Sequence, residues 1–447
     1  MSKYRSIVAD LADRIRSGSL VIGSRLPAQR QLAGELGVDL TTVTRAYTEL
    51  KRMGLVEGRS GSGSFVRAQP AAVPVATAAA ISFDLGMNVP PQPPGLSDRI
   101  AQGLAGLLAA PGANAILGYQ PSGGVAPDRA AAAGWLARRL GPVTEDRVVL
   151  AAGAQSALFA LLDLLLRRGE TLACAGLTYP GVRAIATHLG LRLAGLAHDG
   201  DGIDPQAFED LCRTAPPRAL YVVPTIASPT AATMPPARRQ AIVAIARRHG
   251  VILVEDDAYG ALPEAPPPPF AALAPELAWH VASLSKCATP ALRIAYVAAP
   301  DSRRALQLTA GLRATSLMAS PLLAALATRW IGDGTLDGLT AAIRAENRGR
   351  QRLAADLLPD AAITAQPDGN HLWLTLPAGW TAVAFAAAAW ESGLLVVPAD
   401  VFDVTGSPPE AVRLSLGGVP DRADLERALS RLADLLNWPG APVAAIV

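Results

Sequence analysis

Apolar residues recur every three to four positions through the first 53 residues, which is the spacing of amphipathic helices. Three helices are expected, with Ile7, Leu11 and Ile15 on the inner face of the first, Leu32 and Leu36 on that of the second, and Val43, Tyr47 and Leu50 on that of the third. Gly18 is expected to end the first helix, Leu26-Pro27 to open the second, and Gly37 to cap it. Asp39 is the expected N-cap of the third helix, from about Leu40 to Met53, so the pattern predicts a helix-turn-helix.

The third helix is expected to present a polar face to solvent, made by Thr41, Thr42, Arg45 and Lys51. Short hydroxyls at a helix start, followed by arginine, suit phosphate and base-edge contacts in a DNA major groove. Leu55-Val56-Glu57 and Phe65-Val66 then flank a segment rich in glycine and serine, which predicts a β-hairpin, or wing. A small helical protein-interaction domain with a solvated basic face is the alternative that this pattern leaves open.

Residues 68–82 are rich in alanine and carry no charge before Asp84. We expect an extended linker here. An alanine-rich helix is the alternative, which Pro70 and Pro74 disfavour.

Residues 83–447 alternate apolar runs of strand length with helical patterns. The expected strands include Val148–Ala151, Thr171–Ala175, Leu220–Val223, Val251–Glu255, Val281–Leu284 and Ile294–Ala298. This alternation predicts an α/β fold with a doubly wound, mainly parallel sheet. Ligands of such sheets bind beyond the carboxyl ends of the strands.

Composition and charge narrow the class of protein. Half of the residues are hydrophobic and 17% are charged, as in a globular protein. Residues 1–67 carry 11 Lys+Arg and 6 Asp+Glu, a net charge of +5, which suggests a polyanionic partner for this segment alone. The three cysteines have no disulfide or metal-ligand spacing. With no signal-peptide pattern and no apolar run long enough to span a membrane, the protein is expected to be cytoplasmic and to bind no metal.

Lys286 is the only lysine after residue 51, since the other two are Lys3 and Lys51. The chain uses arginine for its other cationic side chains. Arginine stays charged, so it cannot replace a lysine that must lose a proton and attack a carbonyl. Lys286 is therefore a candidate Schiff-base lysine. A chance lysine that serves as a solvated charge is the alternative.

Chemically useful residues follow several of the expected strands. Residues 153–156 form a glycine turn into a helix, which offers backbone N–H groups to an anion. Asp256 and Tyr259 follow another strand and suit a pyridinium proton and a phenolic oxygen, although solvated turn residues would look the same. Ser283, Ser285 and Arg293 surround Lys286 and suit a phosphate monoester. Together the set matches the needs of pyridoxal phosphate.

Three motifs stand in the first segment: GSLVIGSRLPAQRQLA at residues 18–33, TVTRAYTEL at 42–50 and GSGSFV at 61–66. Together they resemble the winged-helix domain of GntR-family transcription regulators. It implies that double-stranded operator DNA is the partner, contacted by Arg30 and Arg45 with Thr41 and Thr42 nearby. Leu40 departs from the family, which often has arginine there.

The body resembles fold-type I aminotransferases through GYQPSGG at 118–124, LTYPG at 177–181, EDDAY at 255–259, SLSK at 283–286 with Arg293, and VRLS at 412–415. A winged helix fused to such a domain is similar to the MocR subfamily. The resemblance implies a DNA-binding domain at 1–67, a linker at 68–82 and a pyridoxal phosphate domain at 83–447. The large part of that domain would span about 115–310, and the small part about 311–447 with the 83–114 arm.

The resemblance also assigns roles to residues. Lys286 would bind the cofactor covalently, Asp256 would pair with its ring nitrogen, Tyr259 with its ring oxygen, and Tyr179 would stack on the ring. The backbone of Ala154 and Gln155, with Ser283, Ser285 and Arg293, would hold the phosphate. Tyr119 would reach the phosphate of a neighbouring subunit, which implies a homodimer. Arg413 would bind the carboxylate of a substrate or effector; a surface arginine on a strand is its alternative.

One motif departs from these enzymes. Where they usually carry Asn-Pro-Thr-Gly, this chain has Ser228-Pro229-Thr230-Ala231. Ser228 would take the place of the asparagine that bonds the ring oxygen, but it is shorter and would reach that oxygen only through water. Ala231 is expected to be unable to adopt the backbone angles that glycine takes freely. The departure favours a sensor over efficient turnover.

Three functions follow from these patterns. The favoured one is a transcription regulator that binds pyridoxal 5'-phosphate at Lys286 and responds to an amino compound or to the vitamin. The alternatives are an active aminotransferase with an accessory DNA-binding domain, and a cofactor-free dimerisation domain.

Overall fold

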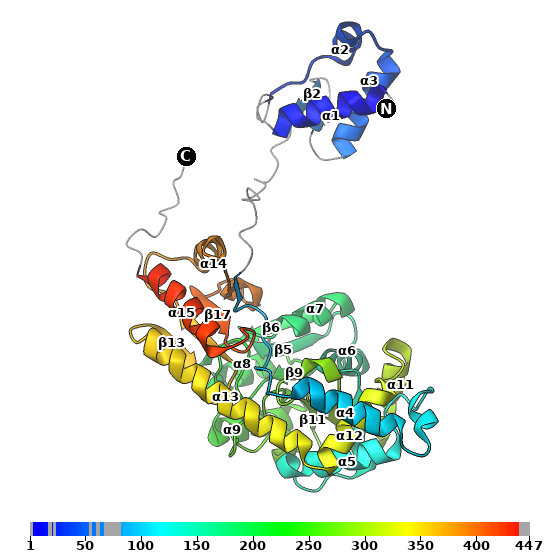
Figure 1. Cartoon of the computed structure of the whole chain (residues 1–447), viewed down its shortest axis with the longest axis vertical. Helices are drawn as coiled ribbons and strands as arrows, with labels where there is room; N and C mark the ends of the chain where they lie inside the picture. Colours follow the sequence, from blue (N-terminus) through cyan, green and yellow to red (C-terminus); the bar gives the residue numbers. More distant parts are fainter. Residues whose placement is uncertain are drawn as a thin grey trace. The chain divides into compact units, whose positions relative to one another are not determined.

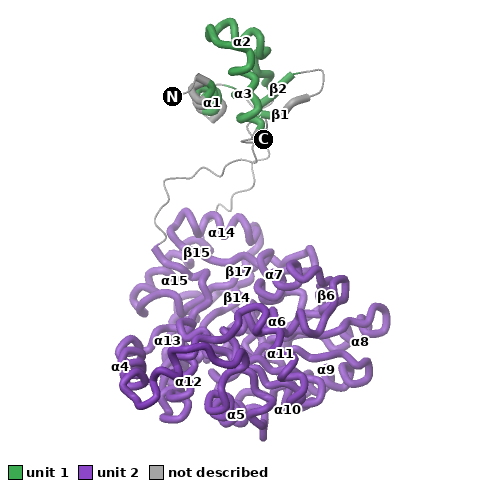
Figure 2. Tube along the Cα trace, turned by 90° about the vertical axis from the view of Figure 1, so that its right-hand side faces the viewer, with its two compact units in different colours: residues 1–78 green, residues 79–447 purple. Residues whose placement is uncertain are grey.

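The computed structural model describes residues 3–16, 20, 24–52, 56–59, 63–66 and 82–437 of the 447-residue chain. The chain divides into two compact units, residues 1–78 and 79–447 (Figure 2). The predicted helix end at Gly18, the tip of the wing at 60–62 and the predicted linker up to residue 81 lie outside the described residues.

The first unit is a three-helix domain with a hairpin. Its elements are α1 (Lys3–Arg16), α2 (Gln29–Leu36), α3 (Leu40–Arg52), β1 (Val56–Arg59) and β2 (Gly63–Val66). The two strands pair antiparallel, with Val56 opposite Val66, as predicted for the wing. Val43, Tyr47 and Leu50 are at most 1% exposed, so the predicted inner face of α3 is confirmed.

The second helix starts later than expected. Residues 24–26 are extended instead, because the Leu26 N–H donates to Ser64 O (2.8 Å) and the Val66 N–H donates to Ser24 O (2.9 Å). This segment therefore adds to the edge of the wing, and Ala28 with extended backbone angles precedes α2. At α3 the Asp39 carboxylate accepts from the Thr41 N–H (2.7 Å), which confirms the predicted N-cap.

The core of the second unit is a seven-stranded sheet in the order β4-β12-β11-β10-β9-β5-β6. Its strands are β4 (Val148–Ala151), β5 (Thr171–Ala175), β6 (Arg192–Leu196), β9 (Ala219–Val222), β10 (Ile252–Asp256), β11 (Ala278–Ser283) and β12 (Ala295–Ala298). Neighbouring strands are parallel except at β12, which is antiparallel to β11 and β4. The predicted mainly parallel sheet is confirmed, and the predicted strand ends differ by at most three residues.

Helices cover both faces of this sheet (Figure 1). One face packs against α6 (Ala154–Leu165), α7 (Pro180–Leu189) and α11 (Ser302–Thr315). The other packs against α5 (Ala126–Leu140), α8 (Pro205–Thr214), α9 (Pro236–His249) and α10 (Phe270–Leu273). The strands alternate between the faces, since Leu172 and Cys174 join the first core and Ala173 joins the second.

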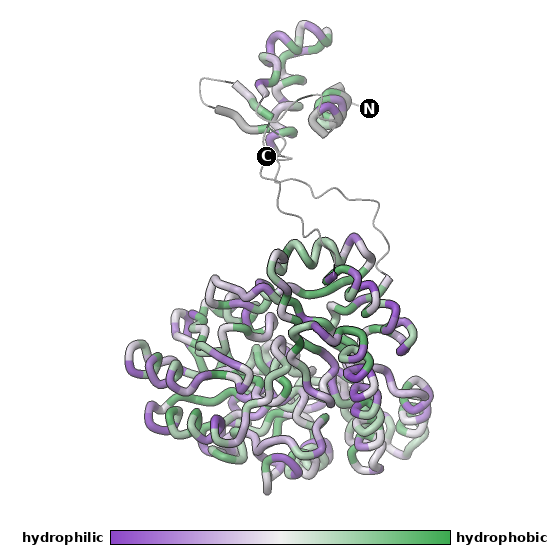
Figure 3. Tube along the Cα trace, turned by 90° about the vertical axis from the view of Figure 1, so that its left-hand side faces the viewer, coloured by the Kyte–Doolittle hydropathy of each residue, from purple (hydrophilic) through white to green (hydrophobic). Residues whose placement is uncertain are grey.

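A smaller sheet, β13-β14-β17-β16, packs against helices α13, α14 and α15. The bounds are β13 (Ala362–Ala365), β14 (His371–Thr375), β16 (Val397–Pro398), β17 (Ala411–Ser415), α13 (Thr335–Leu357), α14 (Ala382–Glu391) and α15 (Arg422–Leu436). Strand β3 (Phe83–Asp84) pairs with β15 (Leu394–Leu395), so the start of this unit is attached to the small sheet's side of the fold. Hydrophilic and hydrophobic stretches alternate along the surface helices (Figure 3).

The remaining elements connect these layers. They are α4 (Leu96–Leu108), α12 (Pro321–Gly332), η1 (Ala113–Ile116), η2 (Glu145–Arg147), η3 (Pro290–Leu292), η4 (Ala399–Val401), β7 (His198–Asp199) and β8 (Gly202–Ile203). Residues 84–90 run from the last residue of β3 towards α4 and belong to the predicted 83–114 arm; from here on, the arm means residues 84–90 only.

Candidate functional site

Lys286 and Asp256 come together because their strands are parallel neighbours. Asp256 is the last residue of β10, and Lys286 lies three residues beyond the end of β11 at Ser283. The Lys286 amine donates to the backbone carbonyl of Asn88 in the arm. Burial, with the Arg413 charge nearby, lowers the pKa of Lys286 to about 8, while Asp256 opposes this. A solvated surface lysine would not have this environment.

Asp256 is a buried carboxylic acid, 5% exposed, and not a solvated turn residue. Its Oδ2 accepts from the Tyr221 hydroxyl at 2.8 Å, and its Oδ1 has no hydrogen-bond partner in the described structure. Burial raises the pKa of Asp256 to about 6, although the Tyr221 hydrogen bond and Lys286 act in the other direction. The free oxygen is an acceptor that a protonated ring nitrogen would satisfy.

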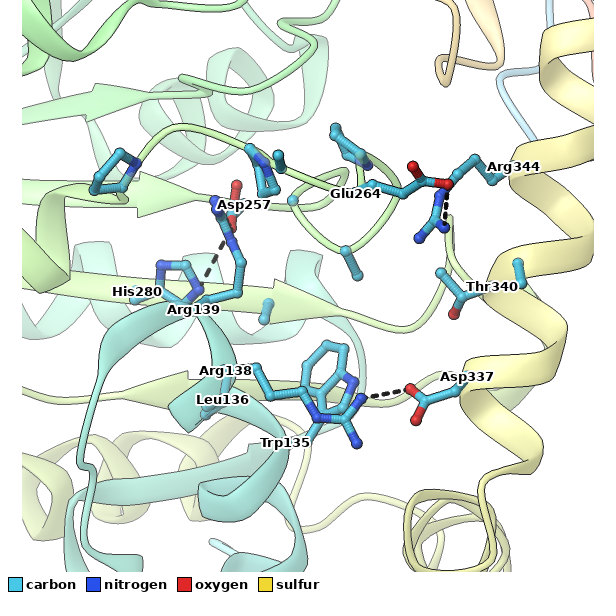
Figure 4. A pocket seen from close by; sticks show the side chains of 18 residues that line it. Trp135, Leu136, Arg138, Arg139, Asp257, Glu264, His280, Asp337, Thr340 and Arg344 are labelled. Carbon is cyan, nitrogen blue, oxygen red and sulfur yellow. Dashed lines mark hydrogen bonds and ion pairs between the residues drawn. The ribbon is translucent and has the colours of Figure 1, made fainter.

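Asp257 faces a different cavity, of about 670 Å³, away from the Lys286 site (Figure 4). Its Oδ2 accepts from Arg139 Nη2 at 2.8 Å and lies 3.7 Å from His280 Nε2. Figure 4 shows two further ion pairs on the same cavity, Arg138 with Asp337 (2.6 Å) and Arg344 with Glu264 (3.3 Å). Asp257 is therefore a buried structural anion.

Tyr259 is 3% exposed and its oxygen accepts from Asn88 Nδ2 at 2.7 Å. Its ring packs against the ring of His371, with centroids 5.4 Å apart. Burial, aided by the Arg413 and Lys286 charges, lowers the pKa of His371 to about 3, so the imidazole is neutral. His371 Nε2 lies 3.2 Å from Ala227 O and therefore carries the proton, which leaves Nδ1 as an unpartnered acceptor.

The predicted anion-binding turn lies at the start of α6. The first helical bond runs from the Ala157 N–H to Gly153 O (3.1 Å), so the N–H groups of Ala154 and Gln155 are outside the helical ladder. A Cβ at Gly153 would lie 2.6 Å from Arg293 Nη2, so the guanidinium packs directly on this turn. Ser283 Oγ also accepts from the Ser285 N–H at 3.1 Å. The structure thus brings together the residues predicted to hold the phosphate.

Tyr179 and Gln155 form a close layer over Gly181. A Cβ at Gly181 would lie 2.2 Å from Tyr179 Cε1 and 2.4 Å from Gln155 Oε1. Gln155 Nε2 donates to Gly181 O at 3.2 Å. Burial and the nearby Asp256 charge raise the pKa of Tyr179, so the Tyr179 hydroxyl lies close enough to Asp256 to interact with its charge.

The loop of residues 227–232 corrects one prediction. Ala231 does adopt a left-handed backbone, with φ of 58°, and it is fully buried. The Ala231 N–H donates to Ala227 O at 2.6 Å and the Ala227 N–H donates to Ala232 O at 2.7 Å. These hydrogen bonds offset the cost of a left-handed backbone at alanine, which is about 1–2 kcal/mol. Ser228 is 8% exposed and lines a cavity of about 30 Å³ with Tyr221 and Thr178.

Arg413 is buried and is not the surface arginine of the alternative interpretation. Its Nη2 donates to Gly86 O at 2.6 Å, its Nε is unpartnered, and its guanidinium lies 5.0 Å from the centre of the Phe402 ring. Burial lowers its pKa, which Tyr259 and Tyr179 partly oppose. An unpartnered N–H on a buried cation is a suitable group for binding a carboxylate.

Tyr119 does not join this cluster within one chain. It is 87% exposed and lies on a cavity of about 480 Å³ with Met318 and Pro321. The prediction that it reaches a neighbouring subunit stays a prediction.

The first unit exposes the residues predicted to read DNA. Thr41, Arg45 and Arg30 are exposed and Thr42 is partly so. The Arg45 guanidinium lies 4.5 Å from the centre of the Tyr4 ring, and the Thr41 hydroxyl donates to Asp39 Oδ1 at 2.5 Å. These contacts orient both side chains at the start of α3.

Three site residues were missed by sequence reasoning: Tyr221, Asn88 and His371. Tyr221 is a phenol inside an apolar strand, and His371 begins another such strand, so each offered a weak signal. Asn88 lies in a proline-rich stretch that gave none. Within the described residues no cluster suits a metal ion, and no helix is long and apolar enough to cross a membrane.

Comparison with known proteins identifies both parts of the chain. Residues 81–432 match the family described as aminotransferase class I and II, and residues 3–66 match bacterial regulatory proteins of the gntR family. The uncharacterized HTH-type transcriptional regulator YdeF of Bacillus subtilis is 27% identical over 438 residues, covering 97% of this chain and 94% of its own. The vitamin B6 salvage pathway transcriptional repressor PtsJ of Salmonella typhimurium is 29% identical over 440 residues, covering 95% and 98%.

A solved structure supports the same fold. The α-aminoadipate aminotransferase LysN of Thermus thermophilus, in complex with N-(5'-phosphopyridoxyl)-L-leucine, aligns with a TM-score of 0.72 at 26% identity. The alignment covers 79% of this chain and 92% of LysN. The predicted combination of a GntR-type domain with an aminotransferase-like domain, as in MocR regulators, is confirmed.

Proposed function

The chain belongs to the aminotransferase class I and II family, and from that membership and its gntR-type first domain we propose that it is a DNA-binding transcription regulator that binds pyridoxal 5'-phosphate at Lys286. It responds to an amino compound or to the vitamin itself. The similarity to PtsJ, named for the vitamin B6 salvage pathway, supports the vitamin as one effector.

The residues present fit the cofactor. Asp256 Oδ1 is a buried acceptor with no partner, which suits a protonated ring nitrogen. Gly153 leaves the space that Arg293 occupies beside the N-terminus of α6, which suits a phosphate. Lys286 would hold the aldehyde, Tyr259 the ring oxygen and Tyr179 the ring face. When bound, the cofactor would supply an electron sink to the amine joined to it.

Protonation states suit this role. With a pKa of about 8, roughly a tenth of Lys286 is unprotonated at pH 7, against about 0.03% for an ordinary lysine. Asp256, with a pKa of about 6, is mostly ionised at pH 7 and can retain a proton on a ring nitrogen. Arg413 would bind the carboxylate of an amino acid effector.

The DNA-binding part rests on α3. Thr41 and Arg45 are exposed and Thr42 is partly exposed, and the three lie over a buried core; Arg30 is exposed on α2. We propose that this face enters the major groove of operator DNA, and that the protein acts as a homodimer in which Tyr119 reaches the neighbouring site.

The buried Lys286 amine beside Asp256, in a chain that also carries the winged helix, is the observation that carries the proposal. It is tested by footprinting the operator while pyridoxal phosphate and a panel of amino acids are titrated. We expect the footprint of the wild-type chain to change with ligand. Lys286→Ala should bind DNA normally without ligand and show no such change. A wild-type chain that fixes no cofactor after borohydride treatment would contradict the proposal.

An active aminotransferase is the second candidate. The joint presence of Lys286, Asp256, Tyr259 and Arg413 in one buried site favours at least a transamination half-reaction. Steady conversion of an amino acid with a keto-acid acceptor, abolished in Lys286→Ala, would support it. Ligand-dependent DNA binding without such turnover would support the regulator function and contradict the aminotransferase function.

A further inference from the structure

Asn88 contacts two of the central site residues at once, although it comes from the arm and not from the sheet. Its backbone carbonyl accepts from the Lys286 amine, and its side-chain Nδ2 donates to the Tyr259 oxygen at 2.7 Å. Its Oδ1 is buried without a partner. Among the described residues, Asn88 alone hydrogen-bonds to both Lys286 and Tyr259.

The arm is held by hydrogen bonds before Asn88 and by close packing after it. Leu85 N–H donates to Leu395 O (2.9 Å), and Ser415 N–H donates to Leu85 O (2.7 Å). The Asp84 carboxylate accepts from the N–H groups of Gly86 (2.8 Å) and Met87 (2.9 Å). Beyond Asn88, Val89 O packs so closely on Gly417 that a Cβ there would lie 2.0 Å from it. Asn88 therefore sits on a fixed support.

The amide of Asn88 determines how the Tyr259 hydroxyl can point. Burial raises the pKa of Tyr259, so the hydroxyl keeps its proton. Because Asn88 Nδ2 donates to the Tyr259 oxygen, the Tyr259 O–H is free to donate to another acceptor. A hydroxyl that accepts one hydrogen bond becomes a stronger donor in the next.

We propose that Asn88 is a positioning residue for the cofactor, whose side-chain amide orients the Tyr259 hydroxyl and thereby lowers the proton affinity of the nitrogen that joins Lys286 to the cofactor. This rests on the proposed function. A donor aimed at the ring oxygen withdraws negative charge from it, so the neighbouring nitrogen holds its proton less tightly. Ser228, where related enzymes carry asparagine, lies instead with Tyr221 and Thr178.

Other charged and titratable groups also act on Lys286 and Tyr259. They are Asp256 on β10, Arg293 after η3, His371 on β14, Arg413 on β17 and Tyr179 before α7. None of these bonds to the Asn88 side chain in the described structure, so a substitution at Asn88 leaves them in place.

The test is a pH titration of the absorbance of the cofactor-loaded, full-length protein. In Asn88→Ala the midpoint should rise by about half to one pH unit, the equivalent of one hydrogen bond. Asn88→Asp keeps the size but loses the donor and adds negative charge, so its midpoint should rise at least as far; it serves if the alanine variant does not fold. Asn114→Ala, an exposed asparagine in the same unit, should leave the midpoint unchanged.

A double-mutant cycle identifies the route. In a Tyr259→Phe background, Asn88→Ala should shift the midpoint much less, because the hydroxyl through which it acts is gone. An unchanged midpoint in both Asn88 variants, or an equal shift with and without the Tyr259 hydroxyl, would overturn the role of Asn88 while leaving cofactor binding established. A wild-type chain with no cofactor band would overturn both this role and the proposed function.

Discussion

Asp256 and Asp257 are adjacent in sequence, but their side chains point to opposite faces of the large sheet. Asp256 accepts from the Tyr221 hydroxyl at 2.8 Å beside Lys286, and Asp257 accepts from Arg139 at 2.8 Å in a separate cavity. Neighbouring residues of a strand point to opposite faces, which explains how two acids in a row can have different environments. The Asp256 carboxylate accepts from a neutral phenol, whereas the Asp257 carboxylate is paired with a cation.

This difference predicts opposite effects on stability. Asp257→Asn should lower the free energy of unfolding by about 3–5 kcal/mol, because it leaves the Arg139 charge buried without its partner. Asp256→Asn should leave the unloaded chain as stable or up to about 3 kcal/mol more stable at pH 7, because a carboxyl whose pKa is raised to about 6 is costly to ionise there. Denaturant unfolding of both variants measures this. Equal losses would contradict the separation of roles.

Capture of pyridoxal phosphate should follow the titration of Lys286. Only the unprotonated amine attacks an aldehyde, so the rate should rise about tenfold per pH unit below pH 8 and level off above it. Stopped-flow absorbance at several pH values measures this rate. Lys286→Ala is the control and should give no band. A rate that keeps rising to about pH 10 would show that the amine has the pKa of an ordinary lysine.

His371 should make stability depend on pH. The imidazole has a pKa near 6.5 in the unfolded chain and about 3 in the folded chain. Below pH 6.5 the unfolded chain therefore binds a proton that the folded chain does not, and the free energy of unfolding falls. The loss should reach about 2 kcal/mol at pH 5. In His371→Asn, unfolding measured between pH 7 and pH 5 should lose that part of the slope. His188→Asn, at an exposed histidine, is the control and should keep the wild-type slope.

Arg45 should contribute to DNA binding directly. Arg45→Ala should weaken operator binding by about 5- to 100-fold. If Arg45 contacts a phosphate, the slope of log K against log salt concentration should also become shallower by about one. Arg14→Ala is the matched control, since Arg14 is an exposed arginine of the same unit that lies 3.7 Å from Asp10. Fluorescence anisotropy at several salt concentrations measures both. Similar losses in the two variants would indicate only a general effect of charge.

The sequence predicted most of the sheet because its strands are apolar runs with clear ends, as at Val148–Ala151 and Thr171–Ala175. It also located Lys286, Asp256 and Arg413, since each stands at a strand end or within a strand where its charge is unexpected. It could not locate Asn88, because contacts between Asn88 and Tyr259 join residues 171 positions apart. Ala231 misled it, because its left-handed backbone depends on hydrogen bonds that close a loop, and these are not readable from residue type alone.

The arm contacts Lys286 and Arg413, the two cations that are proposed to bind ligands. Gly86 O accepts from Arg413 and Asn88 O accepts from Lys286, so a carboxylate at one or an aldehyde at the other competes with a main-chain oxygen of the same short strip. The arm begins at the last residue of β3, the first strand of the second unit that the structure describes. Under the proposed function, ligand binding at either cation would replace a hydrogen bond to a main-chain oxygen of the arm, so the arm would respond to both kinds of ligand.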